Sequence, residues 1–585
     1  MDDNVNSNPS QGPDTAGAAQ TLPTTTPTDK PPPGGAHYAS AAIRRHGSGV
    51  RGLELSRQSL QFEGRFGRLF RTLPGAVHTD ADLKAFAMAM TAKADVNTPE
   101  TQSDDEENTA ISAGYTYLGQ FIDHDLTFDP NSSLQRQNDP DGLTDFRTPR
   151  FDLDNVYGRG PDDQPYLYQD DGIRMLLGRP LTGVVADPGT RGVPRNAPGD
   201  GPTQANPAPP RRALIGDPRN DENVIVSNLQ ATILRFHNKM ADILARKFGR
   251  QPAFDQVQRE VRFHYQWVLL HDFLPTVIGR DRVLQLVPQI ADDGMRQGPT
   301  DFPRNPNRQP ITTLTSHLRF YKVHKNAYMP IEFSVAAYRF GHSMVRPIYR
   351  LNATLTKSDF TFSDDGRQMI FAALDPARNA ESLVGFRDFP APWAVDWSLF
   401  FRMGPNTPFG PQRLQPAYKI DTSLVNPLGN LPSSVASDIP SLAERNLLRG
   451  RSMSLPSGQA VARAMGLEPI PDEKLLVGKA TEESTKGSAT VPKNAPLTNL
   501  SSRFADNAPL WYYILAEAQQ AFVNNGTEIR LGAVGGTIVG EVFVGLLFAD
   551  SHSYVQQHPN WQPHPDFVGS NGVFGIAELL RAVRS

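Results

Sequence analysis

Apolar residues recur at steps of three and four along several stretches of the chain, and this spacing predicts helices. The clearest stretch, residues 224–248, ends in basic residues that suit a helix C-terminus. Its apolar positions are Val224, Ile225, Leu229, Ile233, Phe236, Met240, Ile243 and Leu244. Residues 254–274, 509–524 and 534–547 are further predicted helices, and Pro509 suits a first helical position.

Strand signals are few and short. Glycine and proline together make up 98 of the 585 residues (47 + 51), above the average of about 12%. This excess predicts long loops, at residues 196–210, 295–310 and 471–496. We therefore expect a mainly α fold, a single large helical domain with long loops and little sheet.

The N-terminal residues 1–38 differ in composition from the rest of the chain. They are rich in Pro, Thr, Ser, Asn and Gly, and bury too little apolar surface to offset chain entropy. We expect this segment to be disordered and residues 39–585 to form one catalytic domain. The segment lacks the basic and apolar regions of a secretory signal. The expectation is a soluble protein, either cytoplasmic or exported by a non-standard route.

Charge and cysteine content exclude several classes of protein. The net charge of −4 argues against nucleic acid or an anionic membrane as a partner. No apolar stretch reaches the ~20 residues of a membrane span, and residues 534–547 are interrupted by Glu541. The chain has no cysteine, which excludes disulfides, thiol catalysis and thiolate ligation of iron. Histidine would then be the axial ligand of any haem.

The tripeptide Asp123-His124-Asp125 carries the most chemical information. On a helix, adjacent residues project about 100° apart, so these three side chains must serve three different sites. Taken alone, a short run of Asp and His is also common at helix ends and turns. Its meaning depends on motifs further along the chain.

Four such motifs follow the tripeptide. They are Thr148-Pro149-Arg150-Phe151-Asp152-Leu153-Asp154, Gly216-Asp217-Pro218-Arg219-Asn220-Asp221-Glu222-Asn223, Tyr338-Arg339-Phe340-Gly341-His342-Ser343 and Asn446-Leu447-Leu448-Arg449-Gly450-Arg451. In this order and spacing, with Gln120 before the tripeptide, they resemble the animal-type haem peroxidases of the peroxidase-cyclooxygenase superfamily, in a bacterial form. The resemblance covers about residues 50–585 and makes the helical domain a haem-peroxidase domain that binds haem b.

On the distal side, the resemblance makes His124 the base that takes a proton from hydrogen peroxide and returns it during O–O cleavage. Arg219 would be the fixed cation that stabilises charge on the leaving oxygen. Gln120 matches the residue that lines the distal halide and water site. An exposed or capping glutamine is the ordinary alternative for that position.

Asp123 and Glu222 match the carboxylates that become ester-linked to the haem methyl groups in this family. Members with a third, sulfonium link carry Met just after that Glu. This chain has Asn223 there. A third covalent link is therefore not expected, and the strong halide oxidation associated with it is in doubt.

On the proximal side, His342 matches the iron ligand. A metal-bound imidazole needs a hydrogen bond at its other nitrogen to fix the tautomer. Asn446 occupies the family position for that acceptor. Arg339 is expected near this bond or near a haem propionate.

The resemblance also implies a calcium ion, which takes six to eight oxygen ligands. Asp125 would point toward it. Thr148, Asp152 and Asp154 offer side-chain oxygens at alternate positions of a loop, and Arg150 a main-chain carbonyl. The ion would tie the distal helix to the core. An acidic turn with Asx-type hydrogen bonds is the alternative interpretation.

Two enzyme classes share this scaffold. Fatty-acid dioxygenases use a tyrosine three residues before the proximal histidine, where this chain has Arg339. Tyr338 is one residue away and is expected to project differently. We therefore predict a hydrogen-peroxide-dependent peroxidase that oxidises halide ions, thiocyanate and small aromatic donors through ferryl intermediates. The third possibility, a non-catalytic haem-binding protein, has no need of both His124 and Arg219. The natural donor and the oligomeric state stay open.

Overall fold

The structure of the chain is a computed structural model. It describes residues 64–92, 104–128, 144–145, 147–196, 211–323, 327–356, 367–371, 382–405, 407–433, 435–436, 438–523 and 528–584. All of these fall within one unit, Gly49–Ser585. The predictions of a disordered segment 1–38 and of a domain beginning at residue 39 lie outside the described residues.

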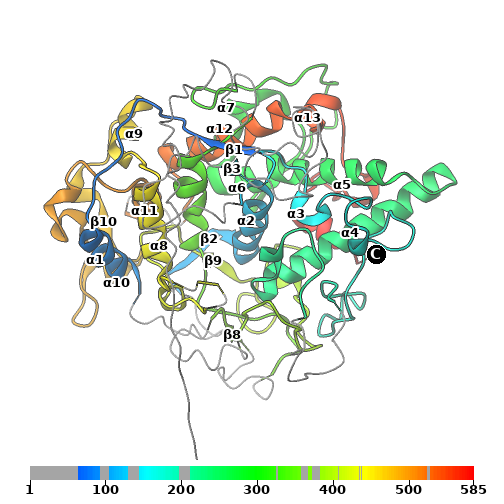
Figure 1. The fold of residues 1–585 in the computed structure, drawn as a ribbon, viewed down its shortest axis with the longest axis horizontal. Helices are drawn as coiled ribbons and strands as arrows, with labels where there is room; N and C mark the ends of the chain where they lie inside the picture. The colour runs from blue at the N-terminus through cyan, green and yellow to red at the C-terminus, as the bar shows by residue number, and fades with distance from the viewer. Residues whose placement is uncertain are drawn as a thin grey trace, which may run out of the picture. The chain divides into compact units, whose positions relative to one another are not determined.

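Helices dominate the described part of the chain (Figure 1). The α-helices are α1 (Asp80–Met90), α2 (Ala113–Leu126), α3 (Asp154–Tyr157), α4 (Val224–Phe248), α5 (Phe254–Val268), α6 (Leu274–Ile278), α7 (Arg280–Leu286), α8 (Leu442–Ser452), α9 (Gly458–Ala464), α10 (Glu482–Lys486), α11 (Leu510–Val523), α12 (Ala533–Ala549), α13 (Tyr554–Gln557) and α14 (Ile576–Ala582). The shorter helical turns that shape the site are η4 (Pro218–Asp221), η5 (Leu269–Phe273), η7 (Glu332–Ala336) and η8 (Ala337–His342).

The strands are short. They are β1 (Gly64–Gly67), β2 (Glu107–Ser112), β3 (Thr144–Asp145), β4 (Met295–Gln297), β5 (Thr300–Phe302), β6 (Met329–Pro330), β7 (Ile348–Tyr349), β8 (Gln368–Met369), β9 (Pro416–Tyr418), β10 (Leu476–Val477) and β11 (Ala495–Pro496). Among the described residues the largest sheet has three strands, in the order β3-β1-β6. The prediction of a mainly α fold with little sheet is confirmed.

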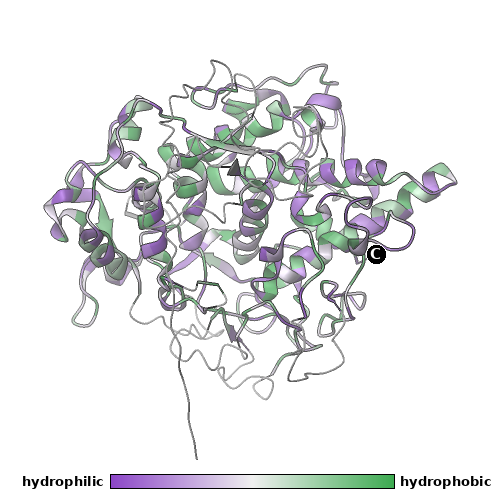
Figure 2. Cartoon of the chain, viewed as in Figure 1, coloured by the Kyte–Doolittle hydropathy of each residue, from purple (hydrophilic) through white to green (hydrophobic). Residues whose placement is uncertain are grey.

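Helix α4 matches its prediction at both ends. The side chain of Asn223 caps it, accepting hydrogen bonds from the main-chain N–H groups of Ile225 and Val226 at 3.1 and 2.9 Å. Gly249 ends the helix in a left-handed conformation, with φ 65°, that glycine adopts at low cost. Figure 2 shows hydrophilic and hydrophobic residues alternating along α4 and α5, as expected for helices with one buried face.

The predicted helix 254–274 continues four residues further, to Ile278, and changes type on the way. Helix α5 passes into the π-helical turn η5, and then into α6. Pro275 lies at the start of α6, where its missing N–H and its ring disrupt the regular α-helical hydrogen bonding of the preceding turn. A π turn absorbs that disruption without ending the helix.

Helix α2, which carries the tripeptide, lies at the centre of the described part of the chain (Figure 1). It packs on α4, β9 and η8. His124 and Asp125 are almost fully buried, with 4% and 0% of their surface exposed. The element that positions the candidate chemistry is therefore a core helix.

The predicted helices 509–524 and 534–547 are α11 and α12. Helix α12 is buried on all sides, and its one carboxylate, Glu541, accepts hydrogen bonds from three main-chain N–H groups between residues 319 and 321. That bonding explains how a charged residue is tolerated in so apolar a helix. Within the described residues, no helix combines the length and the apolar character that a membrane span requires.

Two of the three predicted loops contain regular structure. Residues 295–310 include the hairpin of β4 and β5, whose turn uses Gly298 at φ 54°. Residues 471–496 include β10, α10 and β11. These elements have two to five residues, too few for a periodic pattern to appear in the sequence. Most of the third loop, 196–210, lies outside the described residues.

Candidate haem cavity and cation cluster

A cavity lies between α2 and η8. Helix α2, the turn η8 and the junction between η4 and α4 supply its polar groups. Residues just after β8, residues 428–431 and the start of α8 add an apolar wall. The apolar wall includes Ile370, Phe371, Leu428, Leu431 and Leu442. This combination suits a large, mostly apolar cofactor with a few polar attachments.

Two histidines line the cavity, His124 from α2 and His342 from the end of η8. Burial lowers the pKa of His124 to about 4, helped by the neighbouring Arg219 cation. Burial also lowers the pKa of His342 to about 3, helped by Arg339. Both imidazoles are therefore neutral near pH 7, the form that a metal ligand and a general base each require.

The ring of His124 is oriented by an amide that the sequence analysis missed. Its Nδ1 lies 2.7 Å from Oδ1 of Asn220, and Asn220 uses its Nδ2 to donate to Gln230 at 2.8 Å. Because the Asn220 oxygen accepts, Nδ1 carries the proton and Nε2 is the unprotonated nitrogen. Asn220 directly follows Arg219 in the motif. This adjacency is the one sequence signal that could have identified Asn220 as a partner of His124.

Arg219 occupies a different place from the one expected. Among the described residues it does not line the cavity. Its guanidinium donates to Asp217 at 2.7 Å, to the carbonyl of Thr127 at 2.6 Å and to that of His124 at 3.2 Å. The buried Asp217 carboxylate holds the cation at the C-terminal end of α2. Arg219 therefore holds the C-terminal end of α2, beside the cavity rather than inside it.

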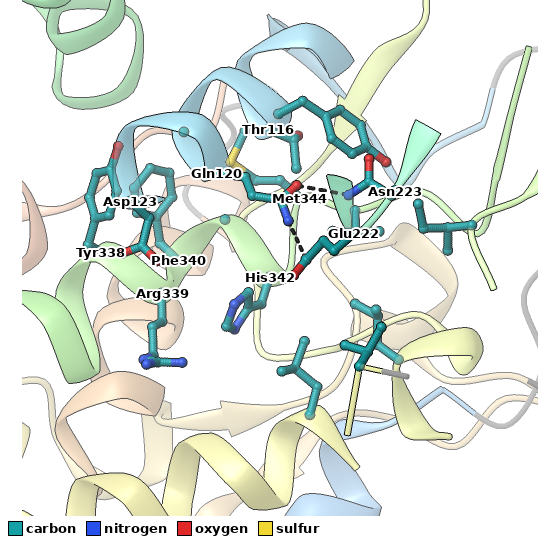
Figure 3. A pocket seen from close by; sticks show the side chains of 18 of the residues that line it. Thr116, Gln120, Asp123, Glu222, Asn223, Tyr338, Arg339, Phe340, His342 and Met344 are labelled. Carbon is teal, nitrogen blue, oxygen red and sulfur yellow. Dashed lines mark hydrogen bonds between the residues drawn. The ribbon is translucent and has the colours of Figure 1, made fainter. Parts of the chain in front are cut away.

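Gln120 lies between Asn223 and Glu222 (Figure 3). Asn223 donates to its Oε1 at 3.1 Å, and its Nε2 donates to the Glu222 carboxylate. All three residues line the cavity, as does Asp123. Burial raises the pKa of Glu222 to about 7. Both carboxylates expected near a haem edge are thus in the cavity, and in the view of Figure 3 His342 lies between them.

The proximal hydrogen bond differs from the prediction in its direction. The Asn446 Nδ2 donates to His342 Nδ1 at 2.8 Å, whereas Asn446 was expected to accept. The cause is Arg339, whose guanidinium has only donors and donates a hydrogen bond to the Asn446 oxygen at 3.2 Å. Arg339 also lines the cavity and donates to the carbonyl of Ser334 at 3.1 Å. The expected partners are together, but the amide is turned.

Tyr338 also lines the cavity, contrary to the expectation that it projects elsewhere. Its segment is a π turn, η7, followed by the 3₁₀ helix η8, so α-helical spacing does not predict side-chain directions there. The Tyr338 hydroxyl is buried and has no hydrogen-bond partner among the described residues. Burial and the Asp123 and Asp125 carboxylates raise its pKa well above the usual range.

The predicted calcium ligands come together on another side of α2. Oxygen atoms of Asp125, Asp152 and Asp154 all lie within 4.8 Å of one another. The Thr148 hydroxyl donates to Asp152 at 2.7 Å. Arg150 turns its side chain toward Asp550, at 3.9 Å, which leaves only its main chain for the cluster. We call Asp125, Asp152 and Asp154 the carboxylate cluster.

The carboxylate cluster fits a cation. Asp125 is fully buried, and within the described residues neither carboxylate oxygen makes a hydrogen bond of ordinary geometry, although the Tyr265 hydroxyl lies near it. Burial and the two neighbouring carboxylates raise its pKa well above the usual range. A buried carboxylate without partners is costly, and three oxygen-rich side chains form the ligand set that Ca²⁺ prefers.

The comparisons with known proteins agree with this geometry. A family model described as animal haem peroxidase matches residues 134–491, more than half of the chain. The chain is 26% identical to the probable oxidoreductase PXDNL of Homo sapiens over 222 residues, which cover 36% of this chain and 12% of that protein. It is 24% identical to thyroid peroxidase of Mus musculus over 233 residues, covering 39% and 22%. The chain thus matches less than a quarter of the length of these curated relatives.

A solved structure shows the same fold. Peroxidase A from Dictyostelium discoideum superposes with a TM-score of 0.52 at 16% identity, over 89% of this chain and 96% of that chain. The agreement therefore extends over nearly the whole length of that structure. Since the family model also covers more than half of the sequence, the chain belongs to the animal haem peroxidase family.

Proposed function

We propose that this protein is a hydrogen-peroxide-dependent haem peroxidase. The cavity would bind haem b, with His342 as the iron ligand and His124 on the opposite side as the distal base. The observation that carries this proposal is the pair of buried, neutral histidines that line one cavity. For neutral His342 to bind iron through Nε2, its Nδ1 must carry the proton, so the Asn446 amide would turn its oxygen toward Nδ1 when the haem is bound. When bound, the haem would supply the oxidising centre that peroxide generates and donors reduce.

The work of His124 follows from its hydrogen bond to Asn220. With Nδ1 protonated, Nε2 can take a proton from peroxide and deliver it to the departing oxygen. A pKa of about 4 keeps Nε2 free to accept a proton at neutral pH. Arg219 would assist indirectly, since it holds the main-chain carbonyls at the end of the same helix.

Asp123 and Glu222 would hold the haem, as ester links to its methyl groups. The ester links are supported by the positions of the two carboxylates, which both line the cavity and come from different elements. Asn223 offers no sulfur for a third link. Denaturing extraction tests this part of the proposal, because complete release of unmodified haem contradicts the esters.

We further propose that the carboxylate cluster binds Ca²⁺, with Thr148 and the carbonyl of Arg150 completing the ligand set. The unpartnered Asp125 oxygens support this assignment. The ion would fix α2, and with it His124, against the loop of residues 147–154. The halide, thiocyanate and aromatic donors remain the proposed reducing substrates, with Gln120 at the edge of the distal space.

One observation favours a second candidate, a fatty-acid dioxygenase. Tyr338 lines the cavity and its buried hydroxyl has no hydrogen-bond partner among the described residues, so a tyrosine is available to a radical mechanism. Tyr338→Phe separates the two candidates. For a peroxidase we expect oxidation of iodide and phenols to stay within about twofold of wild type, whereas a dioxygenase would lose its fatty-acid oxygenation.

The deciding experiment uses haem-loaded protein and hydrogen peroxide. We expect steady-state oxidation of iodide or a phenolic donor. Oxidation of neither, in protein with a His-ligated haem spectrum, would favour a non-catalytic haem-binding protein.

A further inference from the structure

Arg147 lies between two buried carboxylates that belong to different parts of the site. Its Nη1 is 3.4 Å from Asp154, in the carboxylate cluster, and its Nη2 is hydrogen-bonded to Asp217. Only 11% of its side chain is exposed. One guanidinium therefore shares its charge between the cluster and a carboxylate outside it.

Asp217 continues the connection to the distal helix. The same carboxylate oxygen that accepts from Arg147 also accepts from Arg219 at 2.7 Å. Arg219 in turn donates to the carbonyls of Thr127 and His124. Both guanidiniums also lie against the ring of Phe128, at 5.8 and 4.7 Å from its centre.

The electrostatics of this arrangement make it responsive to a cation. Charge interactions inside a protein are only weakly screened, so a divalent ion at the cluster would repel Arg147 and satisfy Asp154. Arg147 would then be attracted more strongly to Asp217. Because Asp217 is shared, its hold on Arg219 would change in the opposite sense. The guanidinium fork suits this sharing, since its donors can serve two carboxylates at once.

We propose that Arg147 is a positioning residue that couples cation binding at Asp125, Asp152 and Asp154 to Arg219, through Asp217. We call Asp154, Arg147, Asp217 and Arg219 the arginine relay. The inference rests on the proposed cation site. Linkage requires that the coupling be reciprocal, so the relay affects both cation affinity and ligand affinity on the distal side.

The first test measures the affinity for Tb³⁺ by luminescence in haem-free protein. Tyr265 provides a sensitiser, because it lies close enough to Asp125 for that carboxylate, together with burial, to raise its pKa. Arg147→Met removes the competing cation, and we expect Tb³⁺ to bind about tenfold more tightly, within the range of about 5–150-fold usual for coupled sites. Equal affinity within twofold would overturn the relay.

A matched control is Arg174→Met. Arg174 also bridges two aspartates, Asp171 at 2.7 Å and Asp242 at 2.6 Å, but contacts neither the cluster nor Asp217. Its replacement should leave Tb³⁺ affinity unchanged. If Arg174→Met raised the Tb³⁺ affinity as much as Arg147→Met does, the effect would come from the loss of any positive charge, and the relay would be overturned.

The second test measures cyanide affinity of haem-loaded protein with Ca²⁺ and after chelation. In the wild type we expect Ca²⁺ to change the cyanide Kd by about fivefold or more. The change should vanish in Arg147→Met. It should also vanish in Asp217→Asn, which interrupts the relay on its other side and serves alone if Arg147→Met does not fold.

The outcomes separate the two proposals. If the wild type binds neither Tb³⁺ nor Ca²⁺, the cation site fails and the relay fails with it. If the wild type binds the cation but cyanide affinity ignores it, the cation site stands and the relay is overturned. A calcium effect on cyanide that survives in Asp217→Asn would also overturn the relay.

Discussion

The haem cavity and the carboxylate cluster use different sides of the same helix, α2, and differ in how the polar side chains of that helix are bonded. In the cavity, His124, Gln120 and Glu222 are hydrogen-bonded to protein partners. In the cluster, both oxygens of Asp125 lack hydrogen-bond partners among the described residues. Hydrogen bonds fix the orientation of a buried side chain that takes part in a reaction. A buried carboxylate without such bonds is costly, and a bound cation would offset that cost.

The largest effect should come from removing the proposed iron ligand. We expect His342→Ala to lose the native Soret band entirely, because the other cavity histidine is oriented by Asn220. The Soret band is measured in absorption spectra of the haem-reconstituted protein. An unchanged spectrum would show that another residue ligates the iron.

The next effect concerns the distal base. His124→Ala should retain bound haem but lower kcat/KM for peroxide by about 10²–10⁴-fold, the usual contribution of a general base. His237→Gln is the control. His237 is also buried, with its pKa lowered to about 4, but it bonds to Tyr157 away from the cavity. If His237→Gln lost activity and His124→Ala kept it, His124 would not be the distal base.

The same histidine gives a pH prediction. The folded-state pKa of His124 is about 4, below the unfolded value of about 6.5, so between these values the unfolded chain binds more protons. Its contribution to stability therefore falls as pH decreases through that window and is complete above it. Peroxide reactivity should likewise be flat above pH ~6 and fall toward pH 4. A kinetic pKa near 6.5 for the His124 step would contradict its burial.

On the other side of α2, removal of a bound cation should lower stability. Saturating Ca²⁺ at about 100 times its Kd would stabilise the fold by about 2.7 kcal/mol. We expect a chelator to lower the thermal midpoint of the wild type. Asp125→Asn should lose most of this response, and the surface variant Asp171→Asn should keep it. An equal response in all three proteins would place the ion elsewhere.

The smallest effect should follow from Asn220→Ala. This change removes the acceptor that fixes the His124 tautomer and leaves the Nδ1 proton without a partner. The cost of a lost hydrogen bond, about 1–1.5 kcal/mol, corresponds to roughly tenfold in peroxide reactivity. Asn220→Asp, which restores an acceptor, should recover part of the rate. A rate equal to that of the wild type would show that packing alone orients the ring.

Much of the scaffold was predictable because its signals are local. The long helix α4 shows its spacing, its cap residue and its terminal glycine directly in the sequence. Helical geometry predicted that the tripeptide side chains diverge, and the family resemblance supplied their destinations. The structure places Asp123 and His124 in one cavity and Asp125 in the carboxylate cluster. The identity of the cluster partners came from the family resemblance.

The missed features depend on side-chain directions and contacts that the motifs themselves do not show. Arg219 does not itself line the cavity, because the buried Asp217 holds its guanidinium, although its charge acts on His124 and Glu222. The amide of Asn446 is turned by Arg339, which is 107 residues away in the chain. Tyr338 reaches the cavity because a π turn precedes it, and no residue spacing indicates that turn.

The position of Asn223 limits how an additional covalent link to haem could be introduced. The same side chain begins the 25-residue helix α4 and donates to Gln120 in the cavity. A methionine there would supply a sulfur for another haem attachment, but it would remove the cap at a cost of about 1 kcal/mol. Acquiring a new covalent bond at this position therefore requires a compensating change that stabilises the start of the helix.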